Sequence, residues 1–379
     1  MNVLLITQEF PPNVLGGVGY HAYHLADALV DAGHDVHVLT GESAQHNQDA
    51  SPPPLSNVEV STISYRRTVA PRLWFARKAI SWLESSTELE TIDLIHSHEY
   101  IDFDAIPFDG VAVQKVHYNL TEKPANLPRT GLPRPFDDLA FSVANATIWR
   151  AERRLERQAI RSADLTIANS ELTKRTCLEH DGVELSDIRV IYNGVDAERF
   201  SPGDESDTTT KLLFVGGDQE RKGIDTILDA LRGLAPSSDV TLTVAGSVDA
   251  LDTAELEATL PIDFVGQVGH DELVELYREA TGLVHPAQYE PFGNVILEAW
   301  ACGTPVVIST PSQCGAAELL EQGTGCSVDP EQPMAVAEAM HELVTTPDRF
   351  DPMACRRIGT RHTWDRVAAA TITLARKHR

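Results

Sequence analysis

The chain has 379 residues, of which 42% are hydrophobic and 23% are charged. This is the composition of a globular protein and excludes a disordered, collagen-like or disulfide-scaffold chain. At roughly 100–200 residues per domain, the length predicts two domains. The 56 acidic and 31 basic residues give a net charge of −25. Such a charge argues against a nucleic-acid binder, because phosphate neutralisation needs a basic face.

The basic residues are divided unevenly between 7 lysines and 24 arginines. An acid excess with few lysines is typical of a halophilic surface, on which salt screens the repulsion between carboxylates. An ordinary acidic cytosolic protein is the alternative. The first residues lack a signal peptide's basic segment, and no run of about 18 apolar residues occurs. We therefore expect a soluble, cytoplasmic protein.

The cysteines are widely spaced and form no Cys-x-x-Cys pair. Such spacing supports neither a zinc site nor a disulfide framework. We expect buried, reduced thiols at all five positions: Cys177, Cys302, Cys314, Cys326 and Cys355.

The N-terminal part alternates between short apolar runs and amphipathic segments. Val3–Ile6 predicts a buried strand, Tyr20–Ala32 a helix, and Val36–Leu39 the next strand. Together they form a β-α-β unit, the building block of a doubly wound α/β domain. The pattern continues with the predicted strands Leu94–His96, Ala112–Val116, Leu165–Ala168 and Val190–Tyr192, and the helix Ile148–Arg161.

A second α/β series follows the polar, acidic stretch Ser201–Thr210, which we interpret as a linker. Its predicted strands are Leu212–Val215, Val240–Ala245, Asp263–Val265, Gly282–His285 and Pro305–Ser309; its predicted helices are Gly223–Leu234, Asp271–Ala280, Asn294–Ala301 and Pro333–Val344. The sequence thus predicts an α/β protein with two Rossmann-like doubly wound domains, residues 1–200 and 201–363, facing across a cleft. Ligands of such sheets bind at the carboxyl ends of the strands.

Two glutamates, Glu290 and Glu298, follow the predicted strand that ends at residue 285. A proline and a glycine place Glu290 in a loop, and we expect Asn294 to cap a helix with Glu298 one turn inside it. The free amides of residues 292–295 would then form an anion site, beside which the carboxylates could hold sugar or ribose hydroxyls. Alternatively, Glu298 is a solvated helix residue and Glu290 a capping residue.

A glycine-rich loop after the strand 212–215 leads to two cations, Arg221 and Lys222, before the next helix. Arginine can fork onto a phosphate, and lysine adds a point charge. Cations at a helix N-terminus are unfavourable unless an anion is present, which favours a phosphate site over a solvent-facing helix start.

With Gly16-Gly17 at the first turn, these segments resemble the retaining glycosyltransferases of family 4, which have the GT-B fold. The Glu290–Glu298 pair is similar to the signature pair of that family. Other similar segments follow in the family's order, so that the resemblance covers nearly the whole chain: Asn169-Ser170, Asn193-Gly194-Val195-Asp196, Gly303-Thr-Pro305 and His362-Thr-Trp364.

The resemblance implies transfer of a sugar, with retention, from a nucleotide diphosphate sugar to a glycan, lipid-linked or small-molecule acceptor, without a metal or other cofactor. It implies that the C-terminal helix 364–379 crosses back onto the first domain. The catalytic residues that it implies are His117, Glu290, Arg221 and Lys222, and the donor-binding residues are Gly216, Arg221, Lys222, Val268, Glu290, Phe292, Gly293, Asn294, Val295 and Glu298.

One position departs from the family pattern. The family usually has an arginine where this chain has Gly217, and we expect Arg221 to substitute for it. Two rival functions stay open: a GT-B epimerase of nucleotide sugars, and a non-catalytic nucleotide-sugar-binding protein.

Three histidines end predicted strands of the first domain. His117 is expected to face the cleft and meet the transferring sugar, as the resemblance implies; a packed strand-end histidine is the alternative. His96 and His98 are two residues apart on one strand and point to one face. A metal pair would lack a third ligand, so we expect these two to be structural or to line the cleft.

Gly17-x-Gly19-x-x-Ala22 also formally fits a dinucleotide-binding fingerprint, but about nine residues separate these glycines from the strand. We expect Gly16 and Gly17 instead to let the backbone approach a phosphate or the acceptor.

Residues 60–83 contain no acidic residue but several arginines and tryptophans. This mixture fits an interfacial helix at the inner membrane surface and hence a lipid or lipid-linked acceptor. An exposed helix near the acceptor groove is the alternative.

Overall fold

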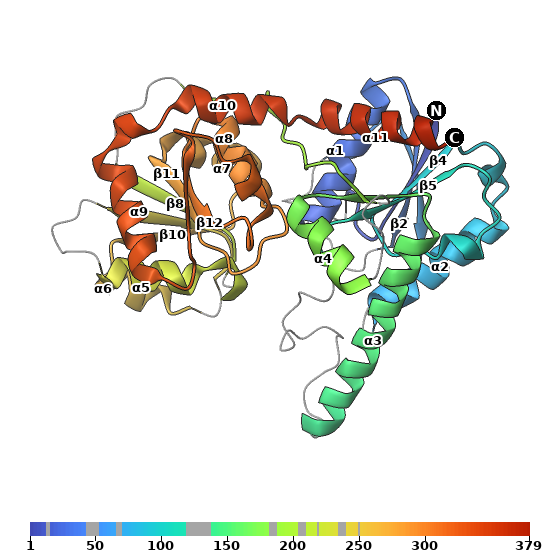
Figure 1. The fold of residues 1–379 in the computed structure, drawn as a ribbon, viewed down its shortest axis with the longest axis horizontal. Helices are drawn as coiled ribbons and strands as arrows, with labels where there is room; N and C mark the ends of the chain where they lie inside the picture. Colours follow the sequence, from blue (N-terminus) through green and yellow to red (C-terminus); the bar gives the residue numbers. More distant parts are fainter. Residues whose placement is uncertain are drawn as a thin grey trace. The chain divides into compact units, whose positions relative to one another are not determined.

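The computed structural model describes residues 1–12, 16–42, 53–65, 70–118, 138–181, 188–203, 210–217, 220–233, 240–248 and 251–379 (Figure 1). The chain forms two compact units. Unit 1 comprises Met1–Ile191 and Val367–Arg379, and unit 2 comprises Tyr192–Arg366.

The units divide between Ile191 and Tyr192. The sequence analysis placed this boundary later, after residue 200. Residues after Tyr192 are tied to unit 2: the amide of Val195 donates to the carbonyl of His362 at 2.8 Å, and Arg356 donates to the carbonyl of Phe200 at 2.7 Å. Of the proposed linker Ser201–Thr210, residues 204–209 lie outside the described residues, and Ser201 accepts hydrogen bonds from Arg278.

Unit 1 contains a seven-stranded sheet in the order β3-β2-β1-β4-β5-β6-β7, in which all paired neighbours are parallel. The strands are β1 Asn2–Thr7, β2 Asp35–Gly41, β3 Val58–Ile63, β4 Leu94–Ser97, β5 Val111–Val116, β6 Leu165–Ala168 and β7 Ile188–Val190. The strand order reverses between β1 and β4, which makes this the switch point at which doubly wound sheets bind ligands.

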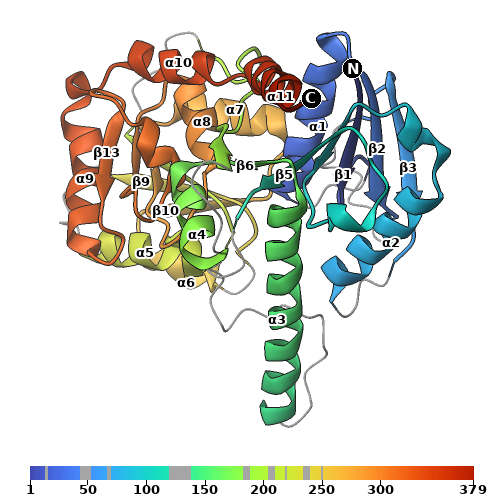
Figure 2. The same ribbon diagram turned by 45° about the vertical axis from the view of Figure 1, so that its right-hand side comes forward.

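The helices of unit 1 are α1 Gly17–Asp31, α2 Pro71–Ser85, α3 Asp138–Ser162, α4 Glu171–Asp181 and most of α11 Trp364–His378. Figure 2 shows α3 extending well beyond the sheet of this unit. Arg379 pairs with Asp93 at 2.8 Å, so the end of the chain is fastened to the first unit.

Unit 2 contains a six-stranded parallel sheet in the order β10-β9-β8-β11-β12-β13. Its switch point lies between β8 and β11. The strands are β8 Lys211–Val215, β9 Thr241–Ala245, β10 Ile262–Gly266, β11 Gly282–His285, β12 Val306–Ser309 and β13 Gly325–Val328; the helices are α5 Ile224–Gly233, α6 Thr253–Thr259, α7 His270–Glu279, α8 Asn294–Ala301, α9 Pro333–Thr345 and α10 Pro352–Arg361.

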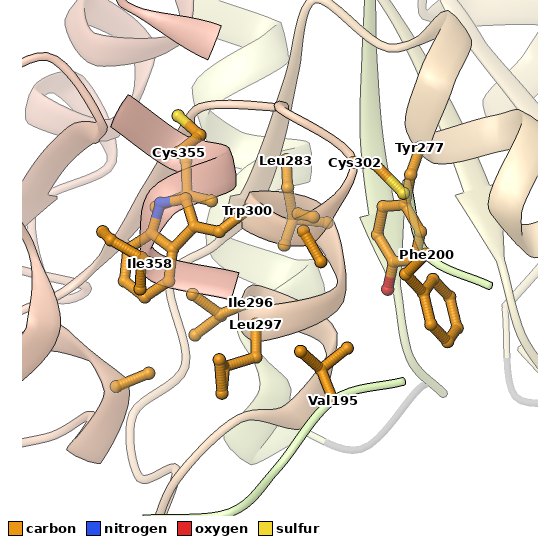
Figure 3. Close-up of a cluster of buried hydrophobic side chains, with 14 of the residues drawn as sticks. Val195, Phe200, Tyr277, Leu283, Ile296, Leu297, Trp300, Cys302, Cys355 and Ile358 are labelled. Carbon is orange, nitrogen blue, oxygen red and sulfur yellow. The ribbon is translucent and has the colours of Figure 1, made fainter. Parts of the chain in front are cut away.

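Two hydrophobic cores cover the two faces of the sheet in unit 2. Leu213 belongs to one core, whereas its neighbours Leu212 and Phe214 belong to the other, as expected for alternating side chains of a strand buried on both faces. Figure 3 shows the first core around Trp300 of α8, whose indole N–H donates to the carbonyl of Thr324 at 2.9 Å. This first core holds α8 firmly beside the switch point.

Three predicted elements need correction. Residues 60–63 are part of a strand, β3, and only residues 71–85 form the helix predicted within 60–83. The helix predicted from Ile148 begins at Asp138, and the strand predicted at 190–192 is β7, which ends at Val190. In the first case, pairing of Val58–Ile63 with β2 determines the structure, which local composition does not show.

All five cysteines are free thiols, and four of them are buried. The expectation is wrong for Cys326, which is only partly buried because it lies in the edge strand β13. Among the described helices, none combines the length and the apolar character needed to cross a bilayer.

Candidate functional site

The loops after β8 and β11 meet at the switch point of unit 2. The amide of Gln288 donates to the carbonyl of Arg221 at 2.9 Å. Gly223 has a φ of +84°, and a Cβ atom there would lie 2.1 Å from the carbonyl oxygen of Pro286. Only glycine allows this approach. The backbone therefore brings Arg221 and Lys222 beside the loop that carries Glu290.

Three positively charged or donor groups converge on one oxygen of Glu290. Its Oε2 lies 2.5 Å from Lys222 Nζ, 3.4 Å from His285 Nε2 and 3.9 Å from Arg221 Nη1. Glu290 is only 8% exposed. Burial alone would raise the pKa of its carboxyl group, but Lys222, His285 and Arg221 hold the pKa well below its usual range. Glu290 is therefore ionised at neutral pH.

The backbone around Glu290 is fixed by the loop after β12. The Glu290 amide donates to the carbonyl of Gln313 at 2.7 Å, and its carbonyl accepts from the amide of Gly315 at 2.9 Å. Further along the same two segments, the amide of Ala316 donates to the carbonyl of Phe292 at 2.9 Å. This short ladder holds the segment leading into α8 in one conformation.

The N-terminus of α8 differs from the prediction that Asn294 caps it. Gly293, with a φ of +98°, precedes the helix, and Asn294 is its first residue. The side chain of Asn294 instead accepts a hydrogen bond from Asn193 at 2.8 Å. A cap needs extended backbone geometry, which a residue in the first helical turn cannot adopt. The amide of Ile296 donates to the carbonyl of Gly293 at 3.0 Å, whereas helix geometry gives the amides of Asn294 and Val295 no carbonyl partner within the helix.

Glu298 lies one turn into α8, as predicted, and accepts a hydrogen bond from Tyr277 of α7 at 2.8 Å. Burial raises the pKa of Glu298 to about 7, although the bond from Tyr277 opposes this shift. Val268, in the loop between β10 and α7, packs against the same core as Tyr277. The ends of several strands therefore contribute to this edge of unit 2.

Two glycines bring the ends of β8 and β9 together. A Cβ atom at Gly246 would lie 1.9 Å from the carbonyl oxygen of Gly216. Gly216 thus has a structural role at the predicted site. Gly217, where the family usually has arginine, follows it directly, and Arg221 instead reaches the Tyr289 carbonyl at 3.4 Å.

In unit 1, a group of histidines lies at the carboxyl ends of β4 and β5. His98 Nδ1 is 2.9 Å from His117 Nε2, and the ring of His21 on α1 lies edge-on to His117 at 4.7 Å. The structure therefore confirms that His117 follows a strand end, and it places His98 directly beside His117. His96 is buried, and the centroid of its ring lies 4.8 Å from the centroid of the His98 ring.

Sequence reasoning missed His21 and Lys115. Lys115 is buried in β5 and donates to the carbonyl of Ile191 at 2.9 Å; burial lowers its pKa to about 7. His21 joins a group that excludes His96: nitrogens of His21, His98 and His117 all lie within 4.8 Å of one another. Helical spacing from Gly17 would have indicated that His21 faces the sheet.

Gly16 precedes α1, and Gly17 is its first residue. The amide of Gly16 donates to the carboxylate of Glu9 at 2.9 Å. An anionic group thus already occupies this helix N-terminus, as the helix dipole favours.

The basic and aromatic stretch 60–83 is only partly at the surface. Phe75 is wholly buried, and the ring of Trp82 lies edge-on to His37 at 5.7 Å. Arg72 faces Glu152 of α3 at 3.7 Å. Arg66 and Arg67 lie outside the described residues, and Arg77 and Lys78 are the exposed cations of α2.

Comparison with known proteins identifies related chains over nearly the whole length. The sequence profile of glycosyltransferase family 4 matches residues 15–199, and the profile of glycosyl transferases group 1 matches residues 209–346. A glycogen synthase of Mycobacterium tuberculosis is 28% identical over 403 residues, covering 98% of this chain and 93% of that protein.

Two solved structures show the same fold. Sucrose-phosphate synthase from Thermosynechococcus elongatus has a TM-score of 0.76 at 21% identity, covering 99% of this chain and 98% of that chain. HepE of Anabaena, in complex with UDP and glucose, has a TM-score of 0.67 at 20% identity, covering 98% and 99%.

Proposed function

Since this chain belongs to the family 4 glycosyltransferases and has the GT-B fold, we propose that unit 2 binds a nucleotide diphosphate sugar. The observation that carries the proposal is the pair Arg221 and Lys222, held beside the N-terminus of α8 at the switch point of the sheet. Cations and helix amides together form a site for a diphosphate. Glu298 would hold the ribose, and Val268 would border the base.

The proposed reaction moves the sugar to an acceptor with retention of configuration. The bond between the anomeric carbon and the diphosphate oxygen breaks, and the acceptor hydroxyl oxygen bonds to that carbon on the same face. The acceptor proton passes to the leaving diphosphate. Arg221, Lys222 and the amides of residues 292–295 stabilise the negative charge that develops on the diphosphate.

Glu290 is proposed to bind the donor sugar through its second oxygen. Among the described residues, the three neighbours of its carboxylate all contact Oε2, and we propose that Oε1 binds a sugar hydroxyl. His117 of unit 1 is proposed to contact the transferred sugar. The side chains assigned to the diphosphate already supply positive charge, so we propose a reaction without a metal ion, which activity retained in EDTA would support.

The acceptor is proposed to be a glycan, a lipid-linked glycan or a small molecule. An interfacial contact of residues 60–83 with an anionic membrane is a separate proposal, and among its described cations Arg77 and Lys78 are the exposed ones. Sedimentation with anionic vesicles tests it: binding that is lost in the Arg77→Glu, Lys78→Glu double variant supports the contact, and no binding by the wild type contradicts it.

The decisive experiment is a donor screen. The purified protein is mixed with UDP-, GDP-, ADP- and dTDP-sugars in molar KCl and in dilute buffer, and the melting temperature is recorded. A ligand at about 100 times its Kd stabilises the folded state by about 2.7 kcal/mol, which is readily measured. One nucleotide should stand out, and Lys222→Ala should abolish its effect. No response to any donor would contradict the proposed site.

The two salt conditions also test the proposed halophilic character. Screening by KCl should raise the melting temperature of a chain with a net charge of −25. An acidic surface of this kind suits a cytoplasm of high salt, where we propose that the enzyme works. A melting temperature that does not depend on KCl would contradict this part of the proposal.

A further inference from the structure

A direct hydrogen bond joins two imidazoles in unit 1. His98 follows β4 and His117 follows β5, and their rings are nearly parallel at 17° with 5.2 Å between centroids. His98 Nδ1 lies 2.9 Å from His117 Nε2. The side chain of Asn169 also donates to the carbonyl of His117 at 2.8 Å. Both the backbone and the ring of His117 are therefore fixed.

Both imidazoles are neutral at physiological pH. Burial is the largest cause that lowers the pKa of His98 and of His117 well below the ordinary value. Among the described residues, the titratable groups that face this pair are His21 of α1, His96 of β4 and Lys115 of β5, and none of these three is acidic. Each neutral imidazole carries one N–H, so one ring donates in the bond and the other accepts.

The position of the shared proton follows from His98. Its Nε2 is buried and has no hydrogen-bond partner within the described part of the chain. If His117 donated, His98 would carry its own proton on Nε2, which would be a buried N–H without an acceptor. If His98 donates from Nδ1, its Nε2 is only an unused acceptor. In native proteins, buried N–H groups without an acceptor are rarer than buried acceptors without a donor.

We propose that His98 is a positioning residue that donates from Nδ1 to His117 and thereby keeps the proton of His117 on Nδ1. His117 then presents an N–H donor at the nitrogen that the bond leaves available. A donor fits an oxygen of the transferred sugar and cannot remove the proton of the acceptor hydroxyl. The inference rests on the proposed contact of His117 with the sugar.

The same geometry weighs against a metal ion shared by His21, His98 and His117. A shared ion needs a lone pair from each nitrogen that faces it. The 2.9 Å separation between His98 Nδ1 and His117 Nε2 instead places a proton between these two nitrogens, so neither is available to an ion. Such an ion is therefore an outcome of the test below and not part of the proposal.

The first measurement is the ¹⁵N NMR spectrum of protein labelled at histidine, without any sugar donor. The His117 signals, assigned with a His117→Gln variant, should show a protonated Nδ1 and a bare Nε2. A protonated Nε2, a charged ring, or a metal-shifted signal that EDTA abolishes would overturn the proposal. This readout does not need transfer activity, so it separates failure of the inference from failure of the proposed function.

The second measurement compares two variants of His98. His98→Asn keeps an N–H donor close to the position of Nδ1 and should retain the His117 spectrum and most of the transfer rate. His98→Leu removes the donor, so the His117 proton should redistribute between its nitrogens and kcat should fall about tenfold with little change in the donor KM.

His96→Leu is the matched control, because His96 is buried beside His98 but, within the described part of the chain, forms no hydrogen bond with His117. It should leave the His117 spectrum unchanged. Equal spectra and rates for His98→Leu and His96→Leu would overturn the positioning role. If His98→Leu does not fold, the wild-type and His98→Asn spectra still decide the position of the proton.

Discussion

The two switch points use the same sheet topology for different electrostatics. In unit 1, where His98 follows β4 and His117 follows β5 beside the switch point, burial keeps both imidazoles neutral. In unit 2, between β8 and β11, mutual pairing keeps Glu290 ionised beside Lys222. Topology therefore determines where chemistry can occur, and the loop residues determine whether it involves charge. Charge is found where the proposed reaction releases a diphosphate, and neutral donors where it handles a sugar.

Removing Lys222 should have the largest effect on transfer. Lys222→Ala takes away the cation nearest to Glu290 and one of the groups assigned to the leaving diphosphate. Loss of such a transition-state interaction typically lowers kcat by about 100–1,000-fold. Steady-state rates with the donor found in the screen provide the measurement. Lys211→Ala, at the exposed start of β8, is the control and should stay within twofold of wild type. A Lys222→Ala enzyme as active as wild type would contradict the proposed electrostatic difference between the two units.

The second-largest expected effect concerns two glycines with positive φ, Gly223 in unit 2 and Gly33 in unit 1. Gly223→Ala should destabilise unit 2, because its Cβ would meet the Pro286 carbonyl oxygen at 2.1 Å at a positive φ. Strain of this kind costs about 1–3 kcal/mol, measurable by urea unfolding. Gly33→Ala is the matched control: it has a similar φ of +78°, but its Cβ would have open space among the described residues. The control should lose about 1–2 kcal/mol at most, from φ alone. Equal losses would show that the two loops of unit 2 do not need this close approach.

Much of this architecture could be predicted from local sequence. Leu165–Ala168, Gly282–His285 and Asn294–Ala301 agree with the predicted elements residue for residue, because they are short apolar runs or helices bounded by glycine, proline or aspartate. β3 and its parallel partner β2 were not predicted as a pair, since pairing depends on residues distant in the sequence.

The candidate sites show the same limit. The neighbours Arg221 and Lys222 were found because their positive charges are unusual at a helix start, and the structure brings them to Glu290. The bond between His98 and His117 joins residues 19 positions apart on neighbouring strands, and no local pattern encodes it. Burial also changes what a residue does. Lys115 reads as an ordinary strand lysine, but it lies in the core of unit 1.

Replacing Glu290 by glutamine should weaken transfer and strengthen nucleotide binding. In the free enzyme, Lys222 pairs with Glu290. Glu290 would therefore compete for Lys222 with the proposed diphosphate. Glu290→Gln frees the ammonium group but keeps the side-chain shape. We expect transfer to fall about tenfold and the Kd of the nucleoside diphosphate to fall about threefold, by calorimetry. Weaker binding of the nucleotide would show that Glu290 holds Lys222 in its productive position and does not compete for it.

The smallest expected effect is a difference in pH dependence between the units. The pKa of Glu298 is raised from 4.5 to about 7, so its carboxyl group binds a proton more tightly in the folded protein than in the unfolded chain. Its contribution to stability is present below pH 4.5 and is lost as the pH rises to 7. The buried histidines of unit 1 have lowered pKa values, so their contribution is present above pH 6.5 and is lost as the pH falls. The two switch points therefore respond with opposite signs.

Glu298→Gln separates the two responses, because glutamine does not titrate. The melting temperature of this variant relative to wild type should rise by a few degrees between pH 5 and pH 8, while the loss of stability at acid pH, due to the histidines, should persist. Glu290 does not interfere, because its lowered pKa places its titration below this range. A constant difference between variant and wild type would mean that Glu298 ionises normally, and that the charged site of unit 2 consists of Glu290 and its cations alone.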